Sequence, residues 1–92
     1  MDSIVTLDVS DLEPPQPMHK ICQTLTTLQP GQLLHVEHRR KPVPLFAILA
    51  QQQFDYRHSE VSAGKHYIWV WRQGDKQAYD SLMRHFDETD WT

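Results

Sequence analysis

Hydrophobic and polar positions alternate with a period of two in four short stretches of the chain, and this period predicts β-strands. The four stretches are residues 4–8, 33–38, 54–60 and 66–72. The last stretch is the strongest strand signal, because β-branched and aromatic residues fill most of it. Residues 62–65, Ser-Ala-Gly-Lys, have the composition of a hairpin turn in which Gly64 adopts a positive φ.

Apolar residues at helical spacing predict three helices between and after these strands. The first helix opens with Pro17 in its first turn and stops at Pro30-Gly31, and the second opens at Pro44. The third covers residues 75–87, with Asp75 near its N-cap. Their apolar stripes are, in order, Met18, Ile21, Cys22, Leu25 and Leu28; Leu45, Phe46, Leu49 and Ala50; and Tyr79, Leu82, Met83 and Phe86.

The order strand, helix, strand, helix, strand, strand predicts an α/β fold of the α+β two-layer sandwich type. Strand–helix–strand connections cross over right-handed, so both helices should lie on one face of a mixed four-stranded sheet. We expect residues 1–73 to form one domain and residues 74–92 to form a C-terminal helical tail.

The other face of this sheet should carry an aromatic stripe of Tyr67, Trp69 and Trp71, which a monomer rarely leaves uncovered. Two coverings are open at this point: the C-terminal helix of the same chain, or a second copy in a homodimer. The residues expected to take part in self-association are Tyr67, Trp69, Trp71, Tyr79, Leu82 and Phe86.

Composition narrows the class of protein only slightly. The chain has 92 residues with mixed charges and a formal net charge of -3, which argues against general nucleic-acid binding. No stretch approaches the roughly 20 apolar residues that span a bilayer, so no membrane partner is expected. A single cysteine, Cys22, forms neither an internal disulfide nor a cysteine-based zinc site alone, and it favours a cytoplasmic location.

Two motifs resemble the TusA-like (SirA-like) superfamily. Residues 12–18, Leu-Glu-Pro-Pro-Gln-Pro-Met, are similar to the Cys-Pro-x-Pro motif that opens the first helix in that family, and residues 28–32, Leu-Gln-Pro-Gly-Gln, are similar to its turn before the second strand. The Glu-Pro-Pro-x-Pro-Met form, with residues 38–45, resembles an uncharacterised branch, a domain of unknown function sometimes fused to haemerythrin-like domains. The resemblance covers about residues 4–72. Ser10-Asp11 and Gln53 depart from it, and Gln53 stands where a glycine is common.

The resemblance implies a sulfur-carrier scaffold without its nucleophile, because Pro14 stands where the family has cysteine. Proline has neither a thiol nor an N–H group, so sulfur transfer is not expected. Cys22 is the alternative carrier, but it lies on an apolar stripe, where a buried thiol is inert. The chain shows no glycine-rich phosphate loop and no Ser–His–Asp context, and we do not expect an enzyme.

The candidate site lies where the first two strands end, because ligands in open α/β sheets bind beyond the carboxyl ends of parallel strands. The residues expected at this ligand or partner surface are Glu13, Pro14, Met18, His38, Arg39, Arg40 and His66; the last of these joins them because the sheet order that the resemblance implies puts the final strand antiparallel beside the second. With Lys41 and two helix N-termini, they predict a site for a small anion or a protein partner. A metal or haem site using His38 and His66, with or without Glu13 as a third ligand, is a second interpretation, and ordinary solvated residues are a third.

The other four histidines are expected to play no part in the site. His35 lies three residues before His38 on the same strand, so its side chain points to the opposite face of the sheet and cannot share a ligand with His38. His19, His58 and His85 are expected at the surface. The sequence thus predicts a non-catalytic TusA-like binding or accessory domain that acts through protein partners or an anionic ligand and needs no cofactor. The alternatives are a metal- or haem-binding redox accessory protein, or a sulfur carrier using Cys22.

Overall fold

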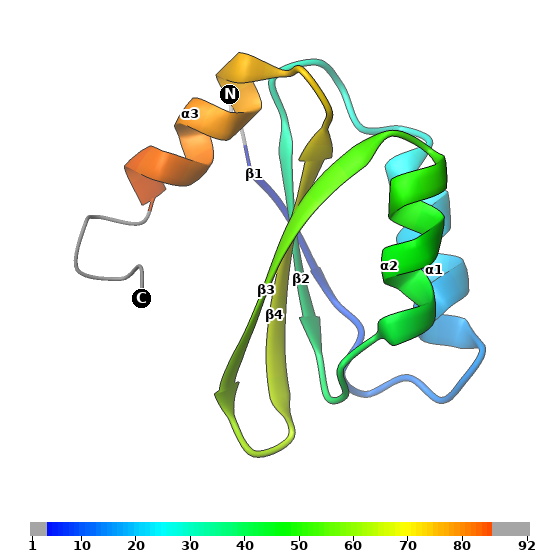
Figure 1. The fold of residues 1–92 in the computed structure, drawn as a ribbon. Coiled ribbons are helices and arrows are strands. Elements are labelled where there is room, and N and C mark those ends of the chain that lie inside the picture. The colour runs from blue at the N-terminus through cyan, green and yellow to red at the C-terminus, as the bar shows by residue number, and fades with distance from the viewer. Residues whose placement is uncertain (1–3, 86–92) are drawn as a thin grey trace.

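A computed structural model describes residues 4–85 of the chain and shows a four-stranded sheet with three helices (Figure 1). The strands are β1 (Ile4–Asp8), β2 (Leu33–His38), β3 (Phe54–Ser62) and β4 (Lys65–Arg72), and the helices are α1 (Gln16–Leu25), α2 (Val43–Gln51) and α3 (Lys76–His85). The strand order is β1-β2-β4-β3, with β1 parallel to β2 and β4 antiparallel to both of its neighbours. The predicted α+β fold class, mixed sheet and C-terminal helix are confirmed.

Both α1 and α2 lie on the same face of the sheet, as the right-handed crossover rule requires (Figure 1). Their buried side chains meet the alternate residues of β2 and β4 that point to this face. The resulting core contains Val9, Ile21, Leu25, Leu28, Leu34, Val36, Leu45, Leu49, Phe54, Ile68 and Val70. Ala50, which was expected on the apolar stripe of α2, is exposed instead.

Helix α1 ends at Leu25, one turn before the predicted stop at Pro30-Gly31. The hydroxyl of Thr26 donates to the carbonyl of Gln23, and the hydroxyl of Thr27 donates to the carbonyl of Thr24. Such bonds compete with helix continuation by satisfying the last carbonyl groups locally. Leu28 still reaches the core, but it does so from the turn that follows the helix.

Helix α3 covers one end of the opposite face of the sheet (Figure 1). A second hydrophobic cluster joins the two layers there; it contains Leu33, Trp69, Trp71, Ala78 and Leu82. The chain's own helix therefore covers this part of the aromatic stripe. Tyr67 lies outside this cluster, half-buried, with its ring edge-on to His35 at a centroid distance of 4.8 Å.

Part of the surface that was expected to form a homodimer interface is therefore covered within the single chain. Trp69, Trp71 and Leu82 are buried within the single chain, so they form a dimer interface only if α3 moves away. Tyr79 is 43 % exposed although its ring lies 5.9 Å from that of Trp71, and Phe86 lies outside the described residues. Among residues 4–85, no helix combines the length and the apolar character that crossing a membrane requires.

The predicted N-cap of α3 is confirmed, and the same side chain also ties the helix to the turn before β2. One carboxylate oxygen of Asp75 accepts the backbone N–H of Ala78 at 3.0 Å. The other accepts the backbone N–H of Gly31 at 2.7 Å. These backbone bonds lower the pKa of Asp75 below its ordinary value, the Gly31 bond most of all. Gly31 has a φ of 84°, in the left-handed region that L side chains rarely adopt, so the backbone of this turn favours glycine.

Candidate functional site

The pocket at the predicted edge lies where β1 and β2 end and α1 and α2 begin. It has a volume of about 300 Å³. Its lining residues are Pro14, Pro15, Pro17, Met18, Ile21, His38, Arg40, Lys41, Pro42 and Pro44. Five of the six prolines in the chain therefore line this one pocket, which we call the proline pocket.

Prolines occupy the pocket because both helices begin in the same way. Pro15 is the N-cap of α1 and Pro17 follows two residues later, while Pro42 and Pro44 hold the same positions in α2. A fixed φ near the helical value suits proline to a first helical turn. Two short connections thus bring rigid, apolar rings to one edge of the sheet.

These prolines also remove most of the anion-binding capacity expected of two helix N-termini. Pro17 and Pro44 have no N–H group. The N–H of Gln16 donates to the carbonyl of Glu13 at 2.9 Å, and the N–H of Val43 donates to the carbonyl of Lys41 at 2.9 Å. The expectation that helix N–H groups cradle an anion is therefore not supported by this geometry, and recognition of charge falls to side chains.

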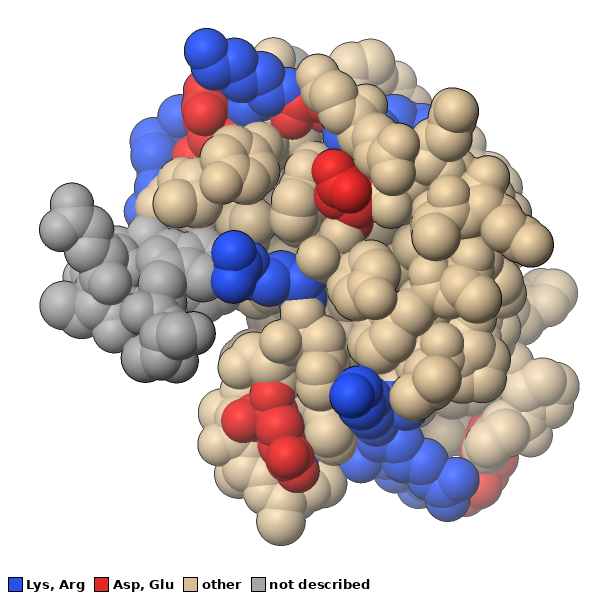
Figure 2. Space-filling model, in the orientation of Figure 1, with Lys and Arg blue, Asp and Glu red and all other residues tan. Residues whose placement is uncertain are grey.

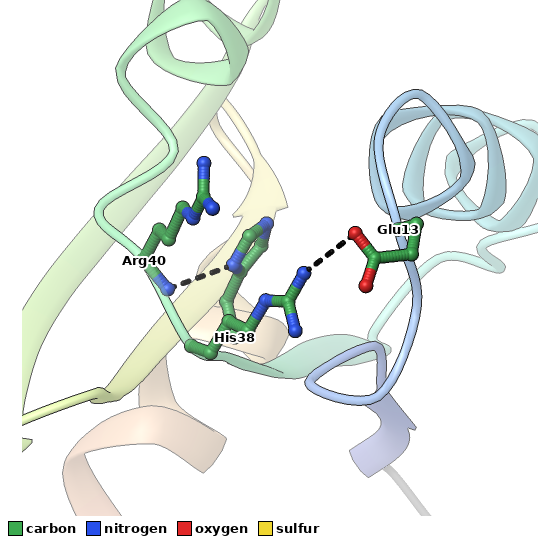
Figure 3. Close-up of polar contacts among 4 residues, drawn as sticks. Glu13, His38 and Arg40 are labelled. Carbon is green, nitrogen blue, oxygen red and sulfur yellow. Dashed lines mark hydrogen bonds and ion pairs between the residues drawn. The ribbon is translucent and has the colours of Figure 1, made fainter.

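Three consecutive cations follow β2, and they have different surroundings. The guanidinium of Arg39 makes an ion pair with Glu13 across a distance of 3.1 Å (Figure 3). Arg40 and Lys41 line the proline pocket, and within residues 4–85 neither makes an ion pair with a carboxylate. Figure 2 shows basic side chains gathered at the lower edge of the molecule, beneath the helix layer of Figure 1. Glu13 therefore neutralises the charge of Arg39. Because Glu13 does not line the pocket, the charges of Arg40 and Lys41 remain available to a ligand.

His38 lines the pocket and holds the loop that carries these cations. Its Nδ1 accepts the backbone N–H of Arg40 at 3.1 Å, a bond that requires an unprotonated Nδ1 (Figure 3). Burial of the imidazole lowers the pKa of His38, and the positive charges of His66 and of the two adjacent arginines lower it further. The site geometry therefore favours neutral His38.

Two more histidines extend from His38 along the same face of the sheet. His66, only 8 % exposed, pairs with His38 across β2 and β4. The Nδ1 of His66 lies 2.9 Å from Nε2 of His58 on β3, and its Nε2 lies 3.9 Å from Glu60. Burial lowers the pKa of His58, as do the charges of His66 and Lys41, while Glu60 acts in the opposite direction.

His58 was assigned to the surface from the sequence, and the structure instead places it half-buried in this cluster. The signal that could have found it is the hairpin register. A tight turn at 62–65 pairs Glu60 with His66, and even-numbered residues of β3 then share a face with His66. The strand pattern of β3 alone did not reveal this neighbour.

The donor set does not fit the predicted metal or haem site. Within the described residues, no group of three or more His, Cys, Asp and Glu side chains has an arrangement that could hold a metal ion. His38 and His66 face each other, but Nδ1 of each is hydrogen-bonded, one to Arg40 and one to His58. Glu13, the third ligand considered, is paired with Arg39.

Cys22 lies on α1 but is not among the residues that line the proline pocket. Its side chain is half-buried, so the predicted full burial is wrong in degree. Its neighbours on the stripe, Ile21 and Leu25, are fully within the core. The thiol therefore lies at the margin of the helix layer, apart from the pocket cations.

Residues 6–72 match a family model described as an uncharacterised conserved protein, DUF2249. The chain belongs to this family. The matched residues include all of the proline pocket and the histidine cluster, whereas α3 lies beyond the end of the match. No curated protein and no solved structure matches the chain.

Proposed function

We propose that this DUF2249 chain is a non-catalytic binding or accessory domain of TusA-like type, and that it recognises an anionic group in the proline pocket. The observation that carries the proposal is the pair of cations, Arg40 and Lys41, that line an apolar pocket without a carboxylate partner in residues 4–85. Arginine binds carboxylate and phosphate groups through a planar fork of donors, and lysine adds a point charge.

The TusA-like part of the proposal rests on where Pro14 lies. The family motif puts a reactive cysteine just before the first helix, and here the ring of Pro14 lines the pocket at that point. A thiolate there would take the terminal sulfur of a donor persulfide and release the donor as a thiolate, but proline has no nucleophilic atom that can do this. The scaffold and the pocket are therefore suited to binding without covalent chemistry.

An NMR titration with sodium sulfate tests anion recognition directly. We expect saturable backbone amide shifts at residues 38–41 and at Val43, and we expect the double variant Arg40→Gln/Lys41→Gln to lose them. Lys20→Gln, which removes an exposed cation from α1, is the matched control and should leave the titration unchanged. A wild-type chain that shows no saturable shift with sulfate or with any carboxylate would overturn the proposal.

The sulfur-carrier and metal alternatives have their own measurements. After incubation with a cysteine desulfurase and cysteine, intact-mass analysis should find no added sulfur on Cys22. Visible absorption and metal analysis of freshly purified protein should find neither haem nor stoichiometric metal. Sulfur on Cys22, or metal that remains bound on titration, would replace the binding-domain proposal with the corresponding alternative.

A further inference from the structure

The walls of the proline pocket limit the kind of ligand that it can hold. Proline rings offer neither N–H donors nor flexible polar groups, and Met18 and Ile21 complete an apolar lining. Proline surfaces and aromatic rings are complementary, as in the recognition of proline-rich segments by aromatic grooves. A small inorganic anion would leave these walls in contact with water and would use only the cations.

The charged groups of the pocket all come from one short loop. The cations Arg40 and Lys41 line it from the connection between β2 and α2, whereas the residues that line it from the start of α1 are apolar. A ligand that fills the pocket would therefore meet positive charge at one end and apolar surface at the other. This polarity suits an anion joined to an apolar body.

The surroundings favour a small molecule over a protein partner. A specific protein interface buries about 800 Å² on each partner and has an apolar centre. Large exposed apolar side chains lie on three different elements, and of these only Val43, 58 % exposed, adjoins the pocket in sequence. The others are Tyr56, Val61, Tyr79 and Met83. The volume of about 300 Å³ lies at the small end of ligand pockets.

We propose that the proline pocket binds a small amphipathic anion, namely a carboxylate attached to an aromatic or similarly compact apolar body. This inference rests on the proposed anion recognition and deepens it by naming the class of ligand. The carboxylate contacts Arg40 and Lys41, and the apolar body packs on the prolines and Met18.

Three probes separate the two halves of the ligand: phenylacetate carries both, acetate carries only the charge, and 2-phenylethanol carries only the ring. NMR shift titrations at fixed ionic strength give the affinity of each. We expect phenylacetate to bind at least about tenfold more tightly than either of the other probes, because only it combines apolar burial with a charge-assisted bond.

Two variants assign the halves to their residues. Arg40→Gln/Lys41→Gln should reduce phenylacetate affinity to that of 2-phenylethanol. Met18→Ser should weaken phenylacetate while leaving acetate unchanged. Met83→Ser, an exposed methionine of α3, is the matched control for Met18. Thermal unfolding of each variant shows whether the fold is intact, and acetate binding by Met18→Ser shows that the pocket itself persists.

The outcomes distinguish this inference from the proposed function. Equal affinity for acetate and phenylacetate would leave anion recognition standing and overturn the amphipathic ligand. Equal affinity for 2-phenylethanol and phenylacetate would overturn both. Saturable binding of a glutamate-rich peptide at residues 38–44, with no response to phenylacetate, would overturn the small-molecule inference and keep the anion site for a protein partner.

Discussion

At Gln53 the backbone takes a φ of 64°, in the left-handed region that glycine adopts without cost. The residue joins α2 to β3, and its carbonyl accepts the N–H of Gln73 at 2.9 Å. A side chain in this conformation costs roughly 1 kcal/mol. The resemblance had marked this position as one where glycine is common, and the backbone supplies the physical reason.

Replacing Gln53 with glycine should therefore stabilise the chain. We expect the free energy of unfolding to rise by up to about 0.5 kcal/mol, because relief of the strained φ slightly exceeds the extra entropy of glycine in the unfolded chain. Urea denaturation followed by circular dichroism measures the change. Gln52→Gly is the matched control: with φ at -95° it has no such strain to relieve, so that variant should be neutral or less stable. Equal effects of the two substitutions would contradict this account.

The two histidines with lowered pKa values, His38 and His58, predict a pH dependence of stability. In the unfolded chain both have ordinary pKa values, so between those values and the lower folded ones the unfolded state binds more protons. Stability should therefore be full above about pH 7.5 and decline as the pH falls through 6.5. The charged and titratable groups that face the pair are His66, Glu60, Arg39, Arg40 and Lys41.

Urea unfolding at pH 7.5, 6.5 and 5.5 tests this dependence. His58→Gln should flatten the decline, because it removes one group that must stay neutral in the folded chain. His19→Gln, an exposed histidine of α1, should leave the decline as it is. If His58→Gln and His19→Gln follow the same curve as the wild type, protonation of the cluster does not contribute to stability.

At this scale the sequence predicted which residues lie together at this edge of the sheet, but not how they pair with one another. The edge follows from the rule that parallel strands end together: His38 and Arg40 line the pocket there, and Glu13 pairs with Arg39 beside it. Loss of helix N–H groups to Pro17 and Pro44 could have been inferred from the sequence, since proline lacks a donor. The pairing of Glu13 with Arg39 rather than with Arg40 could not, because it depends on side-chain rotamers.

Helix α3 depends on a single carboxylate at its start more than its amphipathic pattern suggests. Asp75 caps the helix through Ala78 and also accepts the N–H of Gly31, 44 residues away in the chain. Without it, two backbone N–H groups lose their acceptor, one at the helix start and one in a buried turn. The element is therefore held at its first turn as well as by its apolar face.

Substituting Asp75 with alanine should lower the free energy of unfolding by about 1–2 kcal/mol, the range for loss of an N-cap with a partly buried acceptor. This stabilising contribution depends on pH. Because the pKa of Asp75 is lowered in the folded chain, the contribution is present above about pH 4 and is lost as the pH falls further. Urea unfolding at pH 7 and pH 3 measures both effects. Asp11→Ala, an exposed carboxylate near α1, serves as the control, and an equal loss in both variants would refute the capping role.

The strands and helices themselves were predictable because each has its own period of hydrophobic residues and is bounded by proline, glycine or other turn residues. The bounds of β1 and β2 agree with the alternating stretches, and β3 and β4 differ only at their hairpin ends. The end of α1 was wrong because apolar spacing continues to Leu28 while the threonines before it close the helix with side-chain bonds. The hydrophobic pattern thus identified the elements, whereas local side-chain hydrogen bonds determine where α1 ends.

The covering of the aromatic stripe belongs to the scale of the whole molecule. An amphipathic helix must bury its apolar face, but the pattern is the same whether that face packs on its own sheet or on a second copy. The hydrogen bond from the Gly31 N–H to the Asp75 carboxylate fixes the start of α3 beside the turn that leads into β2 of the same chain. Helix α3 therefore packs on the sheet of its own chain because of the bond at its start, and the aromatic stripe alone would not have decided this.

Leu82 offers the sharpest test of this arrangement, because it is fully buried against the sheet while the adjacent Met83 is 41 % exposed. Leu82→Asp puts a charge into the cluster of Trp69 and Trp71 and should cost about 3 kcal/mol or more. Release of α3 would also bare an aromatic surface, so we expect a red-shifted tryptophan fluorescence and larger species in sedimentation velocity. Met83→Asp adds the same charge at the adjacent, exposed position of α3, and it should leave the stability, the fluorescence and the size of the protein unchanged. If the two variants behave alike in stability, fluorescence and size, α3 does not cover the stripe in solution, and the stripe is left for a second copy.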